Sequence, residues 1–287
     1  MERIRSAIDK AREQRLSQSE TASKAMLRPK GRTGQTEERS EQVKPVGADQ
    51  AWGELRSVRL SLGHLRAQRI FAAETSGQST PFDVLRTQIL YQMRRNNWKR
   101  LAICSPSSGC GKTMTSLNLA MSFSRLPDMR TMVFELDWRR PSMTKVLGLT
   151  ERLQFADALA GKSLAQDQIV RPEKNLAVAP SSSPVRHSAE LLQSARAGQI
   201  LDEIETTYAP DLMIFDTPPV LAGDDTISIL DQMDCALLLA AAERSTTAEI
   251  GRAEKELSAR TNVLGVVLNK CRYLDKSEGY GYGYGNY

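Results

Sequence analysis

The sequence contains few cysteines, and none has the spacing that holds a metal or a redox disulfide. The four cysteines are Cys104, Cys110, Cys235 and Cys271, and no two of them form a Cys-x-x-Cys pair. They lie mostly in apolar stretches or in a glycine-rich loop, which is typical of a reducing compartment rather than of a disulfide framework or a zinc site. We therefore expect a cytoplasmic protein without a structural metal.

Long hydrophobic runs are also missing. The longest apolar stretch, residues 235–242, has eight residues, whereas a membrane-spanning helix needs about 20. The basic residues are scattered, and neither a helix-turn-helix pattern nor an aromatic RNA-binding signature accompanies them. Nucleic acid is therefore not an expected partner.

Charge is distributed unevenly along the chain. The first 100 residues contain 20 Lys and Arg against 11 Asp and Glu, whereas residues 101–287 contain 19 against 23. Such a basic segment suits either an anionic membrane surface or an acidic partner, and a solvated, partly disordered leader is the plainer alternative. We predict three regions, namely a basic, partly disordered extension at 1–76, a folded domain at 77–272 and a tail at 273–287.

The residues that follow the apolar run 101–104 form the most informative motif. Residues 105–113 are rich in small side chains, end in Gly-Lys-Thr and lead into a stretch with the apolar spacing of a helix. A glycine-rich loop between a strand and a helix is the context of a phosphate-binding loop, in which backbone N–H groups surround phosphate oxygens. Lys112 would then bind the β- and γ-phosphates, and the Thr113 hydroxyl would bind Mg²⁺.

The remainder of the chain alternates in the way that a parallel sheet requires. We predict strands near 101–104, 131–136, 175–179, 212–216, 235–240 and 263–268, and helices near 82–91, 114–125, 189–207 and 246–260. Near-continuous apolar strands joined by helices indicate an α/β fold, with a mostly parallel sheet covered by helices on both faces. Ligands of such sheets bind at the carboxyl ends of the strands. Between residues 52 and 69, interleaved apolar and basic residues suggest either a membrane-surface helix or a docking helix.

Three carboxylates come at or just after the ends of two predicted strands. Glu135 and Asp137 end the strand 131–136, and Asp216 ends the strand 212–216, where Thr-Pro-Pro follows. Two carboxylates that are two residues apart point the same way from an extended chain, so both could face the phosphate loop. An acid after four apolar residues is a Walker B pattern, and acids at strand ends hold Mg²⁺ in phosphoryl transfer.

In combination, these motifs resemble the bacterial tyrosine kinases of capsule and exopolysaccharide synthesis. The resemblance covers residues 80–272 and rests on the loop 105–113, the segments 135–141 and 216–219, and the shorter segments 85–87, 189–192 and 265–269. It implies a P-loop NTPase core of the MinD-like class. It also implies an ATP-dependent, Mg²⁺-requiring kinase that regulates polysaccharide polymerisation and export.

The resemblance assigns roles to particular residues. ATP would be bound by Ser108, Gly109, Cys110, Gly111, Lys112, Thr113, Thr115 and Asn269. Catalysis would rest on Lys112, Glu135, Asp137 and Asp216, and Mg²⁺ would be held by Thr113, Glu135, Asp137 and Asp216. Glu135 stands where the family usually has an Asp, which is expected to contact Mg²⁺ and to help the tyrosine lose its proton.

The end of the chain resembles the autophosphorylated tyrosine cluster of this family. Five of the seven tyrosines fall in the last 15 residues, where glycine alternates with tyrosine. Alternating glycine disfavours both helix and strand, so the phenol groups would be presented on a flexible tether. The expected phosphoacceptors are Tyr280, Tyr282, Tyr284 and Tyr287.

The resemblance also implies partners and a place in the cell. A kinase without membrane helices would act beside a separate transmembrane polysaccharide co-polymerase, which recruits it to the inner face of the membrane. Ring assembly of the family uses a Glu-x-x-Arg-x-x-Arg pattern, at which this chain has Thr80, Asp83 and Arg86, so a homo-oligomer remains open.

Two other functions compete with that of a kinase. One is an ATP-binding regulatory switch of the polysaccharide machinery with little kinase activity, which the residues Glu135 and Asp83 favour. The other is a partitioning ATPase of the MinD/ParA type. The signature lysine of that type would fall at Ser107, which makes this the weakest of the three hypotheses.

Overall fold

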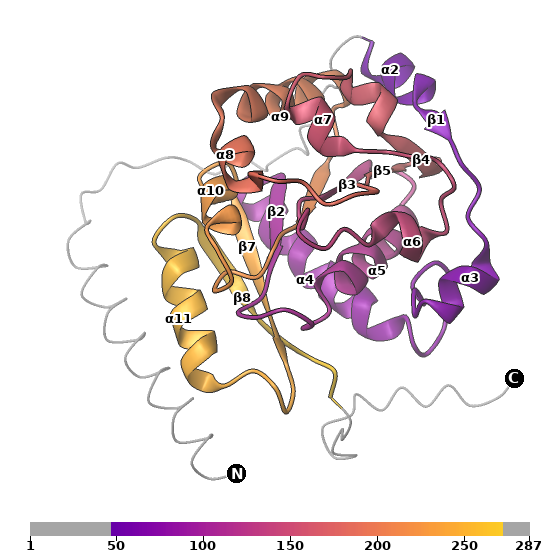
Figure 1. Cartoon of the computed structure of the whole chain (residues 1–287). Coiled ribbons are helices and arrows are strands. Elements are labelled where there is room, and N and C mark those ends of the chain that lie inside the picture. Colours follow the sequence, from indigo (N-terminus) through magenta and orange to yellow (C-terminus); the bar gives the residue numbers. More distant parts are fainter. Residues whose placement is uncertain (1–46, 272–287) are drawn as a thin grey trace, which may run out of the picture. The chain divides into compact units, whose positions relative to one another are not determined.

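The backbone alternates between strands and helices over the residues that the structure describes, 47–271 of the computed structural model (Figure 1). The N-terminal helices and first strand are α2 (Ala48–Glu54), β1 (Arg56–Ser57), α3 (Leu62–Ala67) and α4 (Thr80–Asn96). The middle of the chain forms β2 (Arg100–Cys104), α5 (Lys112–Ser124), β3 (Thr131–Glu135), α6 (Met143–Leu147), α7 (Phe155–Leu159), a 3-10 turn at Ala165–Gln168, β4 (Val170–Glu173) and β5 (Leu176–Ala179). The remainder forms α8 (Ser188–Gln193), α9 (Ala195–Tyr208), β6 (Leu212–Asp216), α10 (Asp225–Leu230), β7 (Cys235–Ala241), α11 (Thr247–Ser258) and β8 (Asn262–Asn269).

The strands form one sheet in the order β1-β4-β5-β3-β6-β2-β7-β8. The six strands from β5 to β8 in this order are parallel, whereas β4 pairs antiparallel with β5 and β1 runs parallel to β4. The predicted mostly parallel sheet is therefore confirmed. The two short strands at its β1 edge are elements that the sequence pattern did not predict, because neither has the apolar run of a buried strand.

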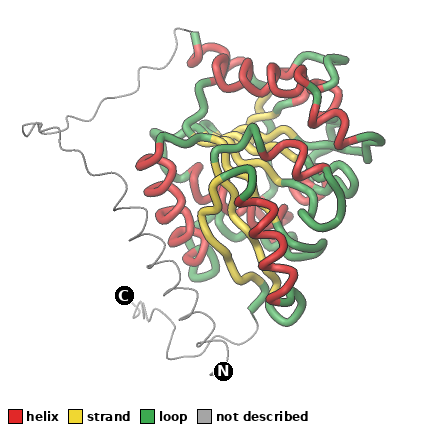
Figure 2. Tube along the Cα trace, turned by 90° about the vertical axis from the view of Figure 1, so that its left-hand side faces the viewer, coloured by secondary structure: helices red, strands yellow, loops and turns green. Residues whose placement is uncertain are grey.

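Helices cover both faces of the sheet, which lies between them in Figure 2. Because side chains alternate along a strand, Leu101 and Ile103 of β2 face one side, and Ala102 and Cys104 face the other. The first side packs against α3, α4, α5 and α6, and the second against α2, α7, α8, α9, α10 and α11. Both faces of the central strands are buried, as their near-continuous apolar sequences predict.

The predicted helix 189–207 is broken into α8 and α9. Ser194 between them adopts an extended conformation, and its hydroxyl accepts a hydrogen bond from the N–H of Ala197 at 3.1 Å. This is the bond of a helix N-cap, which serine favours. The apolar spacing continues across the break, so the periodicity alone predicts one helix where a capping residue starts a second.

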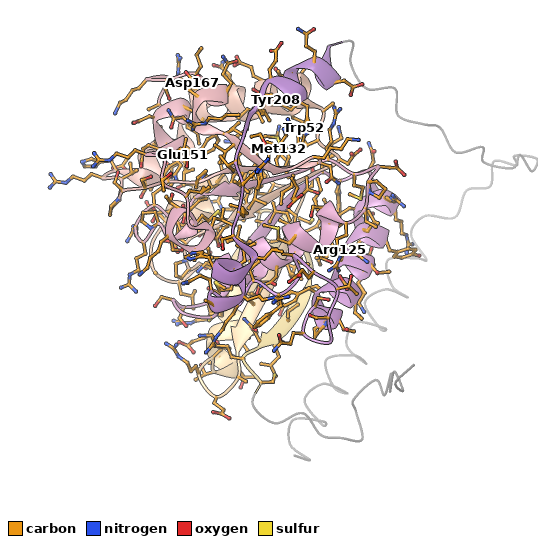
Figure 3. The ribbon with its side chains drawn as sticks, turned by 90° about the vertical axis from the view of Figure 1, so that its right-hand side faces the viewer. Trp52, Arg125, Met132, Glu151, Asp167 and Tyr208 are labelled. Carbon is orange, nitrogen blue, oxygen red and sulfur yellow. The ribbon has the colours of Figure 1, made fainter. Side chains whose placement is uncertain are left out.

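The single helix suggested for residues 52–69 is wrong, because this segment is divided among α2, β1 and α3. Trp52 of α2 is buried, and its indole N–H donates to the carbonyl oxygen of Lys174 at 2.8 Å. The guanidinium carbon of Arg130 lies 5.2 Å from the centre of its ring. Figure 3 labels Trp52 beside Met132 and Tyr208, with which it shares one core cluster. Residues 48–57 are thus packed against the domain that was expected to begin at 77.

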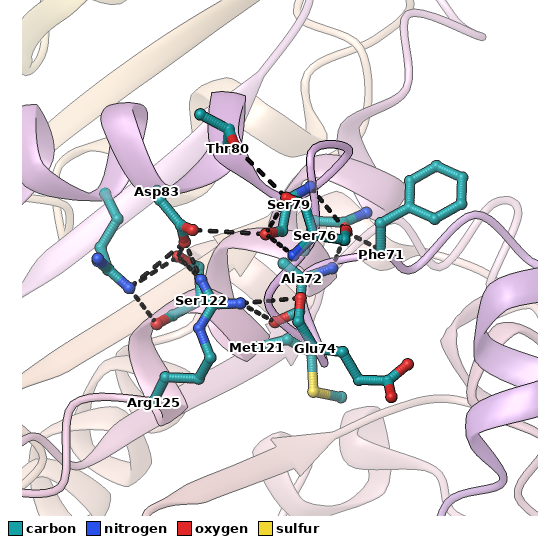
Figure 4. A network of polar contacts seen from close by, with 12 residues as sticks. Phe71, Ala72, Glu74, Ser76, Ser79, Thr80, Asp83, Met121, Ser122 and Arg125 are labelled. Atoms are coloured by element: carbon teal, nitrogen blue, oxygen red, sulfur yellow. Dashed lines mark hydrogen bonds and ion pairs between the residues drawn. The ribbon is translucent and has the colours of Figure 1, made fainter. Parts of the chain in front are cut away.

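The helix α4 is fixed to the C-terminal end of α5 by a polar network around Asp83 (Figure 4). The Asp83 carboxylate accepts hydrogen bonds from the hydroxyl of Ser122 and from the Arg125 guanidinium, and forms an ion pair with Arg86 at 3.4 Å. Arg86 also donates to the backbone oxygen of Ser122 at 2.8 Å. Asp83 and Arg86, at the positions of the family's assembly pattern, are therefore engaged within the chain.

Among residues 47–271, no helix combines the length and the apolar composition needed to cross a membrane. The expectations for residues 1–46 and for the tail at 273–287 lie outside the described residues and stay predictions.

Candidate active site

The phosphate loop joins β2 to α5 at the carboxyl edge of the sheet. Gly109 and Gly111 have φ values of 77° and 96°, in the region that favours glycine. A β-carbon at Gly111 would lie 2.4 Å from Nδ2 of Asn269, so only glycine fits there. Gly111 is the N-cap of α5 and has no side chain to cap the first N–H groups of this helix. These groups are free to bind an anion such as a phosphate.

Lys112, the first residue of α5, is almost fully buried beside a carboxylate. Its Nζ atom lies 3.7 Å from Oδ2 of Asp137, which follows β3. Burial raises the pKa of Asp137, and the nearby positive charge of Lys112 opposes that shift. The predicted pair of a phosphate-loop lysine and an acid after β3 is thus brought together in space.

Thr113 and Asp216 meet beside the same loop. The Thr113 hydroxyl donates to Oδ2 of Asp216 at 2.6 Å, whereas Oδ1 of Asp216 is buried and has no hydrogen-bond partner among residues 47–271. Complete burial raises the pKa of Asp216 to about 7, against the lowering effect of Lys112. A buried carboxylate oxygen without a partner is unfavourable, and a cation or its water would satisfy it.

These residues fit a Mg²⁺ ion that is bound together with phosphates. Among the described residues, no group of three or more His, Cys, Asp or Glu side chains could hold a metal. Mg²⁺ needs no such group, because it commonly takes one or two carboxylates together with substrate phosphates and water. The Thr113 hydroxyl and the free Oδ1 of Asp216 are the ligands that this site offers, with Asp137 nearby.

Glu135 is placed differently from the metal contact that we expected. Its Oε1 accepts from the backbone N–H groups of Ser142 and Met143, and its Oε2 accepts from that of Ser181 at 2.8 Å. Burial raises the pKa of Glu135 to about 7, and these hydrogen bonds oppose the shift. Oε1 of Glu135 therefore binds the backbone at the start of α6, and Oε2 binds the backbone just after β5.

The end of β3 explains why the two carboxylates do not point the same way. Glu135 is the last residue of β3 and pairs in register with Asp216. Beyond it, the N–H groups of Leu136 and Asp137 both donate to the carbonyl oxygen of Asp216. The strict alternation of an extended strand is lost at this point, so the two-residue spacing no longer predicts a shared direction.

The other predicted nucleotide-binding residues surround the loop. Ser108 and Gly109 are exposed at its tip, whereas Cys110 and Thr115 are buried. Asn269, at the end of β8, donates from Nδ2 to the carbonyl oxygen of Cys110 at 2.9 Å. The geometry thus gathers the predicted residues from the ends of β2, β3, β6 and β8. The tyrosines at 280, 282, 284 and 287 lie outside the described residues.

Sequence reasoning missed two basic side chains beside the loop. The guanidinium of Arg244, in the turn after β7, lies 2.9 Å from the position that a β-carbon at Gly109 would occupy. The side chain of Lys270, after β8, comes within 3.9 Å of the corresponding position at Gly111. Both follow predicted strands whose carboxyl ends meet at the site, and this position is the signal that could have found them.

The chain is similar to proteins of one nucleotide-binding family. Residues 101–278 match the family described as the CobQ/CobB/MinD/ParA nucleotide binding domain. Tyrosine-protein kinase CpsD of Streptococcus pneumoniae is 30% identical over 187 residues, which cover 62% of this chain and 79% of that protein. Tyrosine-protein kinase YwqD of Bacillus subtilis is 29% identical over 223 residues, which cover 76% of this chain and 92% of that protein.

A solved structure agrees with these relatives. The kinase domain of the Escherichia coli tyrosine kinase ETK superposes with a TM-score of 0.64 and 25% identity, covering 74% of this chain and 82% of that domain. The chimerical protein CapA2B2 gives the same TM-score at 23% identity, which supports the fold alone.

Proposed function

Because the chain belongs to the bacterial tyrosine kinases of capsule and exopolysaccharide synthesis, within the CobQ/CobB/MinD/ParA nucleotide-binding family, we propose that it phosphorylates its own C-terminal tyrosines with Mg-ATP. The observation that carries the proposal is the contact between Thr113 and Asp216 beside the phosphate loop, which leaves one buried carboxylate oxygen unpartnered. Such a site suits the binding of a phosphate-bound divalent cation.

The residues divide the work of phosphoryl transfer among them. The N–H groups of the loop and of the first turn of α5 bind the phosphates, and Lys112 neutralises charge on the transferring group. Mg²⁺, held by Thr113 and Asp216, supplies further charge neutralisation when it is bound. A tyrosine oxygen attacks the γ-phosphorus, the bond to the bridging oxygen of ADP breaks, and ADP leaves.

The proton of the tyrosine needs an acceptor near the γ-phosphate. Glu135 is unsuited to this role, because its two oxygens already accept three backbone hydrogen bonds. Asp137 stays partly accessible beside Lys112, and burial raises its pKa. We assign the proton to the Asp137 carboxylate, since a general base works best when its pKa lies near the operating pH.

Kinase activity is tested by the response of the tail to loss of Lys112. Wild-type protein and Lys112→Met are incubated with Mg-ATP, and the tail peptides are analysed by mass spectrometry. We expect phosphate on Tyr280, Tyr282, Tyr284 or Tyr287 in the wild type, and a rate at least about 100-fold lower in the variant, because a neutral thioether stabilises no charge. Equal labelling of the two proteins would contradict the proposal.

The second candidate is an ATP-binding regulatory switch with little kinase chemistry, and the engagement of Glu135 with the backbone favours it. A switch would bind Mg-ATP without labelling its tail, even with the cytoplasmic segment of a membrane partner present.

A second experiment separates transfer between molecules from transfer within one molecule. In it, Lys112→Met protein is the acceptor and is mixed with an active form that lacks residues 273–287. A labelled acceptor would establish transfer between subunits.

The proposed place of action is the inner face of the cell membrane. There the chain would be recruited by a transmembrane polysaccharide co-polymerase, as the family membership implies. The basic first 100 residues suit an anionic membrane surface. A homo-oligomer is also part of the proposal, although Asp83 and Arg86 are engaged inside the chain.

A further inference from the structure

The turn that follows β7 brings an arginine to the phosphate loop. β7 ends at Ala241, and the N–H groups of Arg244 and Ser245 both donate to its carbonyl oxygen, at 3.2 and 2.9 Å. Glu243, just before Arg244, has a φ of 62°, a conformation that non-glycine residues adopt only when their surroundings fix it. The backbone that carries Arg244 is therefore tightly folded.

Contacts on both sides fix this turn to the nucleotide site. The Ser245 hydroxyl accepts from the N–H of Ala241 at 3.0 Å and lies 3.6 Å from the sulfur of Cys110 in the phosphate loop. The N–H of Ala242 donates to the carbonyl oxygen of Asn269 at 2.8 Å. Arg244 is thus carried by a turn that contacts both the phosphate loop and the end of β8, so its backbone is positioned before any ligand binds.

The guanidinium of Arg244 lies directly over the loop. A β-carbon at Gly109 would be 2.9 Å from one of its terminal nitrogens and 3.5 Å from its central carbon. Arg244 takes part in none of the ion pairs found among residues 47–271, unlike Arg86 and Arg125, and it differs from other unpaired arginines such as Arg252 in lying beside Gly109. An arginine held beside an anion-binding loop without an anionic partner is suited to bind an anion.

The sheet order places this cation and Lys112 on different sides of the loop. Lys112 approaches Asp137 after β3, whereas Arg244 follows β7, and β2 lies between these two strands in the sheet (Figure 1). A polyphosphate lying along the loop would therefore have a cation on each side. We propose that Arg244 binds the polyphosphate of the nucleotide from the side opposite Lys112, an inference that rests on the proposed function.

Calorimetric titration of the full chain with Mg-ATP and Mg-ADP tests this role. We expect Arg244→Ala to weaken the binding of at least Mg-ATP by about 10- to 100-fold, the range for loss of one charge-assisted hydrogen bond. Arg244→Lys retains part of the affinity, because an ammonium keeps the charge but not the planar fork. Arg252→Ala is the matched control, since Arg252 is an exposed arginine of α11, and it leaves the affinity unchanged.

The thermal midpoint of the nucleotide-free protein separates binding from a structural role. Arg244 is exposed, so Arg244→Ala should leave that midpoint unchanged while reducing its rise on addition of Mg-ATP. Wild-type affinity in Arg244→Ala, or a fall in affinity matched by a lower midpoint without nucleotide, would overturn the assignment of Arg244 alone. A wild type that binds neither nucleotide would overturn the proposed function as well.

Discussion

The side chain of Glu135, the last residue of β3, binds backbone N–H groups and not the metal site that its position in the sequence indicates. Its carboxylate accepts three backbone hydrogen bonds from two segments, at the start of α6 and after β5. An acidic side chain next to the first N–H groups of a helix is favourable, and here it also joins two loops at the edge of the site. A structural role for Glu135 therefore accounts for its burial without requiring a metal.

Removal of this carboxylate should lower stability more than it changes metal affinity. Glu135→Ala leaves three backbone N–H groups without their acceptor, so we expect a loss of about 2–4 kcal/mol in the free energy of unfolding. Urea unfolding measures the loss, and Glu203→Ala, at an exposed position of α9, is the control. If Glu135→Ala keeps its stability but loses Mg-ATP turnover, Glu135 contacts the metal and its role is not structural.

Asp216 should make the stability of the nucleotide-free, metal-free protein fall as pH rises. Its pKa is raised to about 7 by burial, whereas an unfolded chain loses this proton near pH 4. Between these values the folded state binds more protons than the unfolded state, so stability decreases with increasing pH. Asn resembles the protonated acid, so Asp216→Asn should gain stability relative to wild type from pH 5 to 7 and stay level above about 8.

Urea unfolding of the two proteins at several pH values in EDTA provides this comparison. Glu135 also has a raised pKa, and its charge raises the pKa of Asp216, so the difference reports the titration of Asp216 together with its coupling to Glu135. A stability difference that does not vary with pH would mean that Asp216 is ionised in the folded protein throughout this range.

At the scale of elements, the contact between α4 and α5 depends on a network of hydrogen bonds and ion pairs in addition to apolar packing. Asp83 receives the Arg125 guanidinium, and Arg125 also donates to the carbonyl oxygens of Ala72 and Glu74 before α4. One arginine thus ties the segment before α4, α4 itself and the end of α5 together. Asp83 is acidic at a position where the Glu-x-x-Arg-x-x-Arg assembly pattern has an arginine. Inside this chain, the Arg125 guanidinium balances the negative charge of Asp83.

We expect this network to be measurable as a coupling between Asp83 and Arg125. Each single alanine variant should lose about 1–2 kcal/mol in the free energy of unfolding, because both side chains are partly buried. The double variant should lose less than the sum of the two. Asp157→Ala, which removes an exposed pair with Lys162, should cost no more than about 0.5 kcal/mol. Strict additivity in the cycle would show that the two residues act independently.

At the scale of the whole molecule, the sequence predicts the parts of the fold that bury apolar strands. The six parallel strands follow from apolar runs such as 212–216, which the strands inside the sheet need because both of their faces are buried. The edge strand β8 has a similar run, although its Val266 and Leu268 are exposed. β1 and β4 escape prediction, since they are short, partly exposed and polar. The sequence also does not predict the division of residues 52–69 into three elements. The interleaved apolar and basic pattern gives no sign that Trp52 contacts Lys174.

The candidate site is predictable to a similar extent. Lys112, Thr113, Asp137 and Asp216 are found by motif and strand-end position, Asn269 is implied by the family resemblance, and the structure brings them together. The position of Arg244 after the predicted strand 235–240 places it near the site, but its approach to Gly109 also depends on a turn whose conformation has no distinctive sequence signature. The direction of Glu135 is not found, because it depends on the residue at which β3 leaves the sheet.

The sheet order also dictates when, during synthesis, the nucleotide site can exist. Among the described strands, the loop-bearing strand β2 pairs with β6 and β7, and both are encoded more than a hundred residues after it. Asn269, at the end of β8, donates a hydrogen bond to the phosphate loop from even later in the chain. A nascent chain therefore carries an incomplete loop through most of its translation, and long-range pairings of this kind form slowly. The site that would act on the tail can therefore be complete only after Asn269 has been made and has left the ribosome.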